Sequence, residues 1–311
     1  MSRSRALAVV IAVALLGLTV AGPVANAKEN ELAPKHVLKS FANGAPDQGD
    51  KGDAGPKGAK ATNNGISYHG GPVMVAPTTN AYIIWYGNWA GSSATTILQD
   101  LLTNIGGSPY FNINTTYANG SGAKVHNSVT YVSSTTDNAH GTSLSDSTVT
   151  TIVSDAVTSG RLPKDPDGVY FVLTAAGVAE TSGFLTQYCG WHTHASIAGT
   201  DLKYAFIGDP TGPKLSACAV QTTTSPNGNI GADAMASVIA HELEEAVTDP
   251  DLNAWYDSRG YETADKCAWT FGTTFKAANG SAYNMTLGSR QYLIQRNWVN
   301  ASGGSCAVKY P

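Results

Sequence analysis

The stretch HELEEAVTDPD, His241 to Asp251, contains residue types that bind metal ions and activate water. His241 and Glu245 are four residues apart, so on a helix their side chains lie one turn apart on the same side. In the H-E-x-x-H pattern of metallopeptidases, residues at these positions bind zinc and the intervening glutamate is the general base. A carboxylate is also a zinc ligand. We therefore predict that His241 and Glu245 bind Zn²⁺ and that Glu242 accepts a proton.

A third ligand is expected from the acidic segment that follows, Thr248 to Cys267. Glu262 is favoured, because it is far enough from Glu245 for the chain to turn back. Asp251 is the second choice, and Asp265 is expected to support the ligands rather than to bind. The alternative interpretation of this segment is a solvated turn, or a Ca²⁺-binding loop that stabilises the fold.

Two further histidines stand in CGWHTH, Cys189 to His194. His192 and His194 are two residues apart, so on a strand they face the same side. If that strand borders the metal site, one of them binds metal or stabilises a developing oxyanion, and we count both among the candidate catalytic residues. The alternative is a polar turn beside a disulfide.

The helix that positions the motif is predicted over Ala232 to Thr248. Asn229 or Asp233 is a suitable N-cap, and Pro250 disfavours helical geometry at the residue before it. His241 and Glu245 are expected on the side opposite an apolar stripe that packs on a sheet. The stripe comprises Met235, Ile239, Leu243, Ala246 and Val247. The alternative is an ordinary exposed acidic helix, since glutamate is a good helix former.

The elements before this helix alternate between strand and helix patterns, which predicts an α/β fold. Strands are expected over 80–87, 127–134, 168–176 and 202–209, and helices over 93–106 and 145–160. This β-α-β-α-β-β-α order is close to that in which zincin peptidases reach their active-site helix. We therefore expect a zincin-like mixed sheet in one domain, 66–311, whose part 250–311 is irregular or β.

The N-terminus carries a pattern typical of exported proteins. Two arginines, the apolar run Ala6 to Val20 and the small-residue site ANA predict a signal peptide over residues 1–27. A membrane anchor is the alternative, but the run is short for a span, and no later segment is long and apolar enough. Residues 28–65 are predicted to be a flexible linker. Its four Gly-X-Y triplets, Gly49 to Lys60, are too few for a collagen helix, which is the alternative.

Four cysteines agree with export: Cys189, Cys218, Cys267 and Cys306. Three pairings are possible, and spacing alone does not decide among them. We expect Cys189–Cys218 and Cys267–Cys306, because each pair closes a local loop. The alternatives are free buried thiols, or a four-cysteine zinc site, which the wide spacing disfavours.

The charge of the chain excludes one class of partner. The net charge is −4, and removal of the two arginines of residues 1–27 leaves 17 basic against 23 acidic side chains, or −6. Nothing in this charge balance suggests nucleic acid as a partner. The metallopeptidase-like pattern points instead to a protein or peptide substrate.

Several motifs, in order, resemble the phosphate-induced protein family, also called the EXORDIUM family. They are YHGGPVM, YIIWYGNW, CGWHTH, YAFIGDP and TTTSPNGNIGADAMASVIAHELEEAVTDP, within Ser67 to Val308. The resemblance implies a secreted cell-wall or apoplastic protein. It also implies that the His-Glu pair and the glutamate at position 245 are family features, although members have no established biochemical activity. The same residues are similar to secreted zincin-type peptidase domains.

The leading hypothesis is therefore a secreted, metal-dependent hydrolase, specifically a zincin-like peptidase. The rival hypothesis is a non-catalytic extracellular protein that binds wall polysaccharide or a protein partner, since Trp and Tyr are plentiful and aromatic rings stack on sugars. A third is a calcium-stabilised structural domain.

Overall fold

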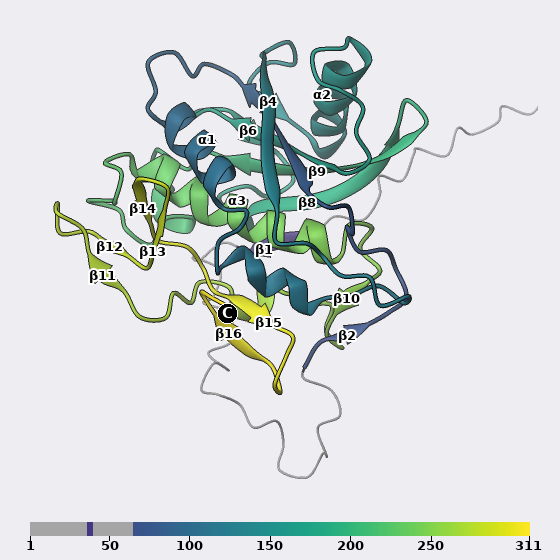
Figure 1. Cartoon of the computed structure of the whole chain (residues 1–311). Coiled ribbons are helices and arrows are strands. Elements are labelled where there is room, and N and C mark those ends of the chain that lie inside the picture. Colours follow the sequence, from purple (N-terminus) through teal and green to yellow (C-terminus); the bar gives the residue numbers. More distant parts are fainter. Residues whose placement is uncertain (1–35, 40–64) are drawn as a thin grey trace, which may run out of the picture. The chain divides into compact units, whose positions relative to one another are not determined.

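The computed structural model describes residues 36–39 and 65–311 (Figure 1). The predicted signal peptide, residues 1–27, lies outside the described residues, as does nearly all of the predicted linker, 28–65. The exception within the linker is strand β1, His36–Lys39, which belongs to the main sheet. None of the helices in the described ranges is long and apolar enough to cross a membrane.

The described domain is built on one six-stranded sheet in the order β1-β8-β9-β6-β3-β4. Its other strands are β3 (Thr79–Tyr86), β4 (Val129–Asp137), β6 (Gly168–Thr174), β8 (Tyr188–Ile197) and β9 (Thr200–Gly208). β4, β3, β6 and β9 run parallel to one another, whereas β8 is antiparallel to both of its neighbours. The predicted α/β class is confirmed, and the sheet is mixed.

Helices cover both faces of this sheet (Figure 1). The helices are α1 (Ala94–Asn104), α2 (Asp146–Thr158) and α3 (Ile230–Thr248). Alternation along β3 explains the layers, because Ile83 and Trp85 point into one core with α1 and α3, whereas Ile84 and Tyr86 point into another with α2. The observed order follows the predicted β-α-β-α-β-β-α series, with β8 added before β9. The sequence around His192 was compatible with either this strand or a polar turn.

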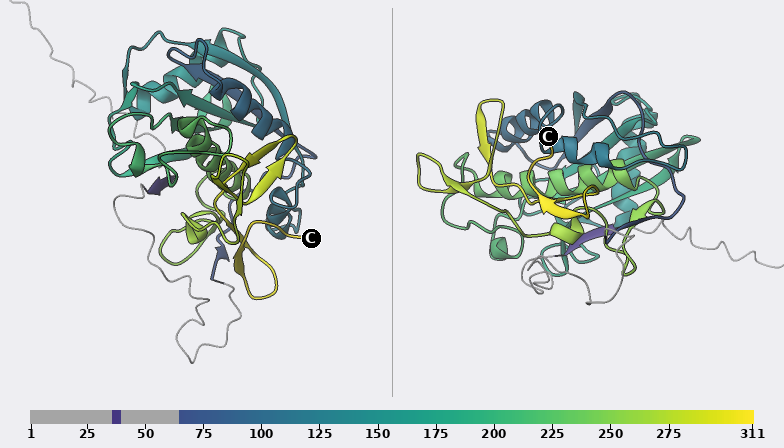
Figure 2. Two further views of the ribbon diagram at one scale, coloured as in Figure 1. Left: turned by 90° about the vertical axis from the view of Figure 1, so that its left-hand side faces the viewer. Right: turned by 60° about the horizontal axis from the view of Figure 1, so that its bottom comes forward.

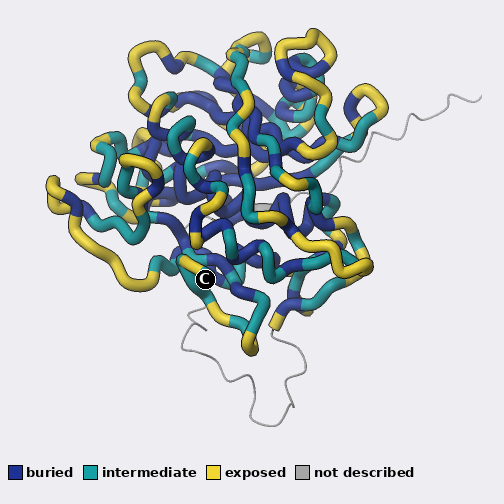
Figure 3. Tube along the Cα trace, viewed as in Figure 1, coloured by how far each residue is buried: buried dark blue, intermediate teal, exposed yellow. Residues whose placement is uncertain are grey.

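Helix α3 is the centre of the molecule. Its N-cap is Asn229, one of the two predicted caps, whose side chain accepts a hydrogen bond from the backbone N–H of Ala232. All of its residues except Ile230 and Ala234 are buried (Figure 3). The interpretation of this segment as an exposed acidic helix is therefore wrong.

The C-terminal part covers the side of α3 that faces away from the sheet (Figure 2). The Ser237 hydroxyl accepts a hydrogen bond from the backbone N–H of Gln295, and Glu244 contacts Asn297. This region consists of one 3-10 helix, turns and two-stranded ladders. The ladders are β2 (Ser67–Tyr68) with β10 (Trp255–Tyr256), β11 (Phe275–Lys276) with β12 (Ala282–Tyr283), β13 (Met285–Leu287) with β14 (Arg290–Tyr292), and β15 (Asn297–Val299) with β16 (Ser305–Ala307).

The remaining short elements lie around the sheet and α3. One further ladder pairs β5 (Ser143–Leu144) with β7 (Ala179–Glu180). The 3-10 helices are η2 (Phe111–Thr116), η3 (Leu215–Ala217) and η4 (Asp265–Cys267).

The cysteines pair as predicted, Cys189–Cys218 and Cys267–Cys306. The first bond ties β8 to the segment that leads into α3. The second ties η4 to β16. Both bonds thus hold segments that surround the histidine-glutamate motif of α3.

Loss of the first disulfide should destabilise the fold measurably. Its two cysteines are 29 residues apart, and closing a loop of that length is expected to contribute about 3–4 kcal/mol by restricting the unfolded chain. The double variant Cys189→Ala/Cys218→Ala should therefore melt about 10 °C lower in calorimetry. The variant Cys267→Ala/Cys306→Ala, with a separation of 39, is the matched comparison and should lose a similar amount. An unchanged melting temperature in both would contradict the loop-closure argument.

Candidate metal centre

The predicted motif places its two ligand candidates side by side. Nε2 of His241 lies 3.1 Å from Oε1 of Glu245, one helical turn later. The carboxylate of Asp265, from η4, lies 3.5 Å from the same nitrogen. The backbone N–H of Asp265 also donates a hydrogen bond to Oε1 of Glu245, at 3.0 Å. Asp265, predicted only as a supporting residue, is thus in direct reach of the imidazole.

Strand β8 contributes the second imidazole. Nε2 of His192 lies 2.9 Å from Oε2 of Glu262 and 3.7 Å from Oε2 of Glu245. The two oxygens of Glu245 therefore face different histidines, Oε1 towards His241 and Oε2 towards His192. Glu262, the favoured third ligand, contacts His192 rather than the ligand pair His241 and Glu245 on α3.

These distances fit a bound cation. Two groups, His241/Glu245/Asp265 and His192/Glu242/Glu245, each have ligand atoms within 4.8 Å of one another. Ligand atoms around a tetrahedral zinc ion with bonds of about 2.0–2.2 Å are about 3.3–3.5 Å apart. The distances from the two imidazoles to Glu245, 3.1 and 3.7 Å, bracket that value.

The imidazole of His241 is also positioned to act as a ligand. Both of its nitrogens are buried; Nε2 faces the carboxylates of Glu245 and Asp265, and Nδ1 makes no hydrogen bond within the described ranges. A cation at Nε2 would contact the same two carboxylates.

The cluster concentrates negative charge away from water. Its carboxylates come from Glu242, Glu245, Asp249, Glu262 and Asp265, of which only Asp265 is more than marginally accessible. The two imidazoles supply at most two positive charges. Gathering several carboxylates in a protein interior is unfavourable unless positive charge or protons balance them, which a bound cation would also do.

Proton binding is visible in the shifted pKa values. Burial alone would lower the pKa of His192, but the charges of Glu262, Glu245 and Glu242 outweigh it and raise the pKa to about 9. For His241 burial likewise acts downwards, and Glu245 and its acidic neighbours raise the pKa well above its usual range. Without a metal, both histidines are therefore held as cations at neutral pH.

Asp249, at the end of α3, holds a proton as well. Burial and the adjacent charge of Glu262 raise the pKa of Asp249 to about 8. One oxygen of Asp249 accepts hydrogen bonds from the backbone N–H groups of Asn253 and Ala254, both at 2.6 Å. This residue shapes the turn that carries the chain from the helix towards Glu262.

Glu242 lies on the side of α3 that faces β8, fully buried. Its ligand atom belongs to the same group as His192 and Glu245. Gly190 of β8 makes room for it, because a β-carbon at position 190 would lie 3.0 Å from Oε1 of Glu242 and 2.5 Å from Cγ1 of Val238.

Substitution of Gly190 should disturb both packing and the site. In Gly190→Ala the new methyl group must displace Val238 and Glu242, and it also approaches the carbonyl oxygen of Phe206 to 3.0 Å. We expect a loss of about 2 kcal/mol of unfolding free energy, measured by denaturant titration. Gly120→Ala is the control, because its nearest neighbour is at an ordinary 3.5 Å. Equal stability of the two variants would contradict this account of the helix–strand contact.

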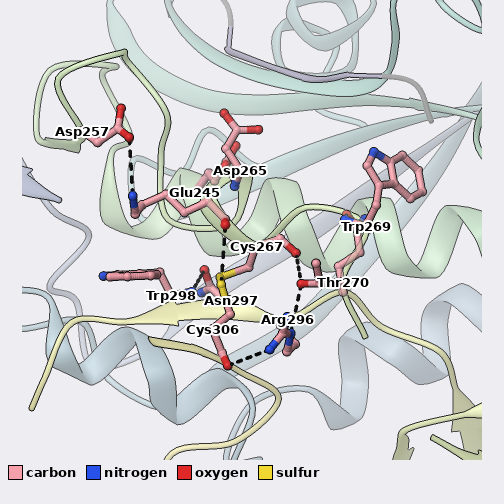
Figure 4. The surroundings of a disulfide bond; sticks show 12 residues. Glu245, Asp257, Asp265, Cys267, Trp269, Thr270, Arg296, Asn297, Trp298 and Cys306 are labelled. Carbon is pink, nitrogen blue, oxygen red and sulfur yellow. Dashed lines mark hydrogen bonds and ion pairs between the residues drawn. A yellow bond between two sulfur atoms is a disulfide. The ribbon is translucent and has the colours of Figure 1, made fainter. Parts of the chain in front are cut away.

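The motif lies on the contact between α3, β8 and η4, not on a face pointing away from the sheet as was expected. His192, His241, Glu245 and Glu262 are each at most about 1% exposed. The Cys267–Cys306 disulfide anchors η4, the turn that carries Asp265 (Figure 4). Access to the site therefore requires some covering segment to move.

Two predicted site residues lie in a different cluster. Nδ1 of His194 is 2.7 Å from Asp201 and 3.7 Å from Asp251. Lys203 forms ion pairs with both aspartates, at 3.0 Å from Asp251. His194, Asp201 and Asp251 also have ligand atoms within 4.8 Å of one another, but the ammonium group of Lys203 already supplies there the charge that a metal would bring.

One acidic residue of α3 serves the structure. Glu244 is fully buried, and it contacts the side-chain amide of Asn297. Burial raises its pKa well above the usual range, so it is a neutral hydrogen-bonding group at pH 7. Nothing in the motif distinguished it from Glu242 and Glu245, since the distinction depends on the C-terminal segment that covers it.

Comparisons with known proteins agree with the motifs seen in the sequence. A family described as "Phosphate-induced protein 1 conserved region" matches residues 66–308. The chain belongs to this family. It is 33% identical over 272 residues to Protein EXORDIUM-like 3 of Arabidopsis thaliana, covering 75% of this chain and 80% of the relative. It is 29% identical over 273 residues to Protein EXORDIUM-like 5 of the same plant, covering 75% of each. No solved structure matches the chain.

The extent of the phosphate-induced protein region has a structural meaning. It spans residues 66–308 and hence includes α3, β8, η4 and every residue of the candidate metal centre. It does not include β1, which therefore adds a strand to the sheet from outside the phosphate-induced protein region.

Proposed function

We propose that this member of the phosphate-induced protein family is an exported metal-dependent hydrolase, specifically a peptidase. The observation that carries the proposal is Glu245, whose two carboxylate oxygens face the imidazoles of His241 and His192 inside a buried acidic cluster. Export rests on the predicted signal peptide and on two disulfides, which persist in oxidising compartments.

The donor set favours zinc. Two imidazole nitrogens with carboxylate oxygens are typical zinc ligands, whereas Ca²⁺ takes six to eight oxygens. His241, Glu245 and His192 are the proposed ligands, with Asp265 or Glu262 completing the set. The two imidazoles belong to separate groups of ligand atoms that share Glu245, so they must move towards each other when the ion binds. A zinc ion there would act as a Lewis acid on water and on a substrate carbonyl.

The chain's own residues supply the remaining functions. Glu242, buried beside His192 and Glu245, accepts a proton from the attacking water. Glu262 and Asp265 hold the imidazoles in position through their carboxylates. The pattern HExxE, with a negative ligand in place of the second histidine, makes the ion a weaker Lewis acid, so a modest turnover is expected.

The burial of the site favours one alternative. A cation enclosed by α3, β8 and η4 would also stabilise a non-catalytic extracellular protein that binds a wall polysaccharide or a protein partner. In that case the metal would raise stability, and no substrate would be hydrolysed. Metal content and hydrolysis must therefore be measured separately.

The experiment is a zinc titration of the purified, chelator-treated protein. We expect one zinc ion per chain, and an affinity at least about 100-fold lower in His241→Ala, because the variant removes one of few ligands. His126→Ala is the matched control, since His126 is exposed, and it should bind as the unaltered chain does. Equal zinc binding by His241→Ala would refute the site.

A further inference from the structure

The outer edge of β8 is occupied by a segment that is not part of the family region. Strand β1 pairs antiparallel with β8, with His36 opposite His192, Leu38 opposite Gly190 and Lys39 opposite Tyr188. Since the family region begins at residue 66, the sheet within that region ends at β8. An exposed sheet edge presents unpaired backbone groups and readily accepts an added strand.

The added strand is anchored on the segments that form the metal centre. Leu38 is fully buried in the same apolar core as α3. The carbonyl oxygen of Lys39 accepts a hydrogen bond from Nε1 of Trp269, at 2.9 Å. The ammonium group of Lys39 lies 3.3 Å from the hydroxyl of Tyr261. Strand β1 thus connects β8, which carries His192, with the 261–269 segment, which carries Glu262.

The register places this strand against the site. Residue 36 lies opposite His192, and residue 38 lies opposite Gly190, whose missing side chain makes room for Glu242. A chain bound at this edge therefore runs antiparallel to β8 along the two positions closest to the candidate ligands. Strand β1 is short, with four residues.

The geometry points to the outer edge of β8 as a binding site for an extended peptide, with residues 36–39 as its intramolecular occupant. Backbone pairing supplies much of the affinity, and a pocket for alternate side chains supplies the preference. The preferred peptide has an aliphatic residue at the position of Leu38, followed by a basic residue. This inference rests on the proposed function in one respect, because it makes an extended peptide the substrate class.

Occupation by the chain itself means that a free peptide must compete. Twenty-five residues, 40–64, join Lys39 to the family domain, and an intramolecular ligand on a tether of this kind acts at an effective concentration on the order of millimolar. A peptide in trans should therefore bind about 10- to 100-fold more weakly while β1 stays in place.

The test uses full chains and a fluorescent peptide with the sequence of residues 34–41, PKHVLKSF. Leu38→Asp should release β1, and this variant should bind the peptide at least about tenfold more tightly than the unaltered chain. Val132→Asp is the matched control, because Val132 is an exposed aliphatic residue on β4, at the other edge of the sheet. It should bind as the unaltered chain does.

Two further measurements keep the result decisive. If Leu38→Asp does not fold, Leu38→Ala takes its place, with a smaller gain in binding expected. Hydrogen exchange of the β8 amides should be faster in the released variant and should slow again with peptide. A folded variant that binds no peptide, or that shows unchanged exchange in β8, would overturn the inference.

All peptide binding is measured in chelator, so that it reports the edge and not the metal. If the separate zinc titration shows no uptake but the released edge binds peptide, the hydrolase is refuted and the edge site stands. If the chain binds zinc but its released edge binds no peptide, the edge site is refuted and the metal centre stands.

Discussion

Glu242→Gln should reduce hydrolysis by roughly a thousandfold while the protein keeps its metal. Removal of a general base typically costs 10²- to 10⁴-fold in rate. The amide has the shape of the carboxyl group, so the packing against Gly190 is preserved. The measurement is cleavage of a peptide library, followed by mass spectrometry, with zinc content determined on the same sample.

The chain offers a matched control for this variant on the same helix. Glu244 is as deeply buried as Glu242, but it faces Asn297 and is held neutral by burial. Glu244→Gln should therefore leave the rate unchanged within about twofold. A rate in Glu242→Gln equal to that of the control would remove Glu242 from the mechanism. Absence of any cleavage by the zinc-loaded Leu38→Asp chain, in which β1 is released, would favour the non-catalytic alternative.

The second large effect is a steep dependence of zinc affinity on pH. The metal-free site holds protons on His192, whose pKa is raised to about 9, and on His241, whose pKa is raised well above its usual range. Zinc requires neutral imidazoles, so binding must expel these protons. If about two protons leave, the affinity should rise about 100-fold per pH unit between pH 6.5 and 8.

Calorimetry in buffers of different ionisation enthalpy counts the released protons directly. We expect about two per zinc ion at pH 7 in the unaltered chain, and about one fewer in His192→Gln. His126→Ala should match the unaltered chain, because its imidazole is exposed. A proton count near zero at pH 7 would contradict the charge state inferred for the cluster.

The same shifts fix how the stability of the metal-free protein changes with pH. His192 has a pKa above its unfolded value, so its contribution is complete below about pH 6.5 and is lost as the pH rises through about 9. Asp249 acts in the same direction, since its raised pKa favours the folded state at low pH and the contribution is lost through about 8. The melting temperature without metal should therefore fall between pH 6.5 and 9, and zinc should reverse the trend.

Local sequence patterns predicted the elements and the motif well, because they depend on neighbours along the chain. The cap at Asn229 and the one-turn spacing of His241 and Glu245 are properties of the helix alone. The pairing of the cysteines also followed from local loop closure. These features required no knowledge of the tertiary structure.

The composition of the site was harder, because it depends on contacts between distant segments. His192 joins Glu262 across 70 residues, and no spacing rule distinguishes it from His194, whose neighbours include Lys203. Strand β1 was not predicted, because it lies in a segment whose glycine- and charge-rich composition favours a linker. The short pattern of Leu38 and its neighbours only becomes a strand because β8 offers an edge.

The complete enclosure of α3 has a consequence for kinetics. An ion held between this helix, β8 and η4 has no open route to bulk water in the described conformation. Binding and release of the ion must wait for a local opening of the protein. A chelator in large excess should therefore extract the ion at the rate of this opening, which does not depend on chelator concentration. The occupancy of the purified protein would then record the solution in which it folded, rather than the one in which it is stored.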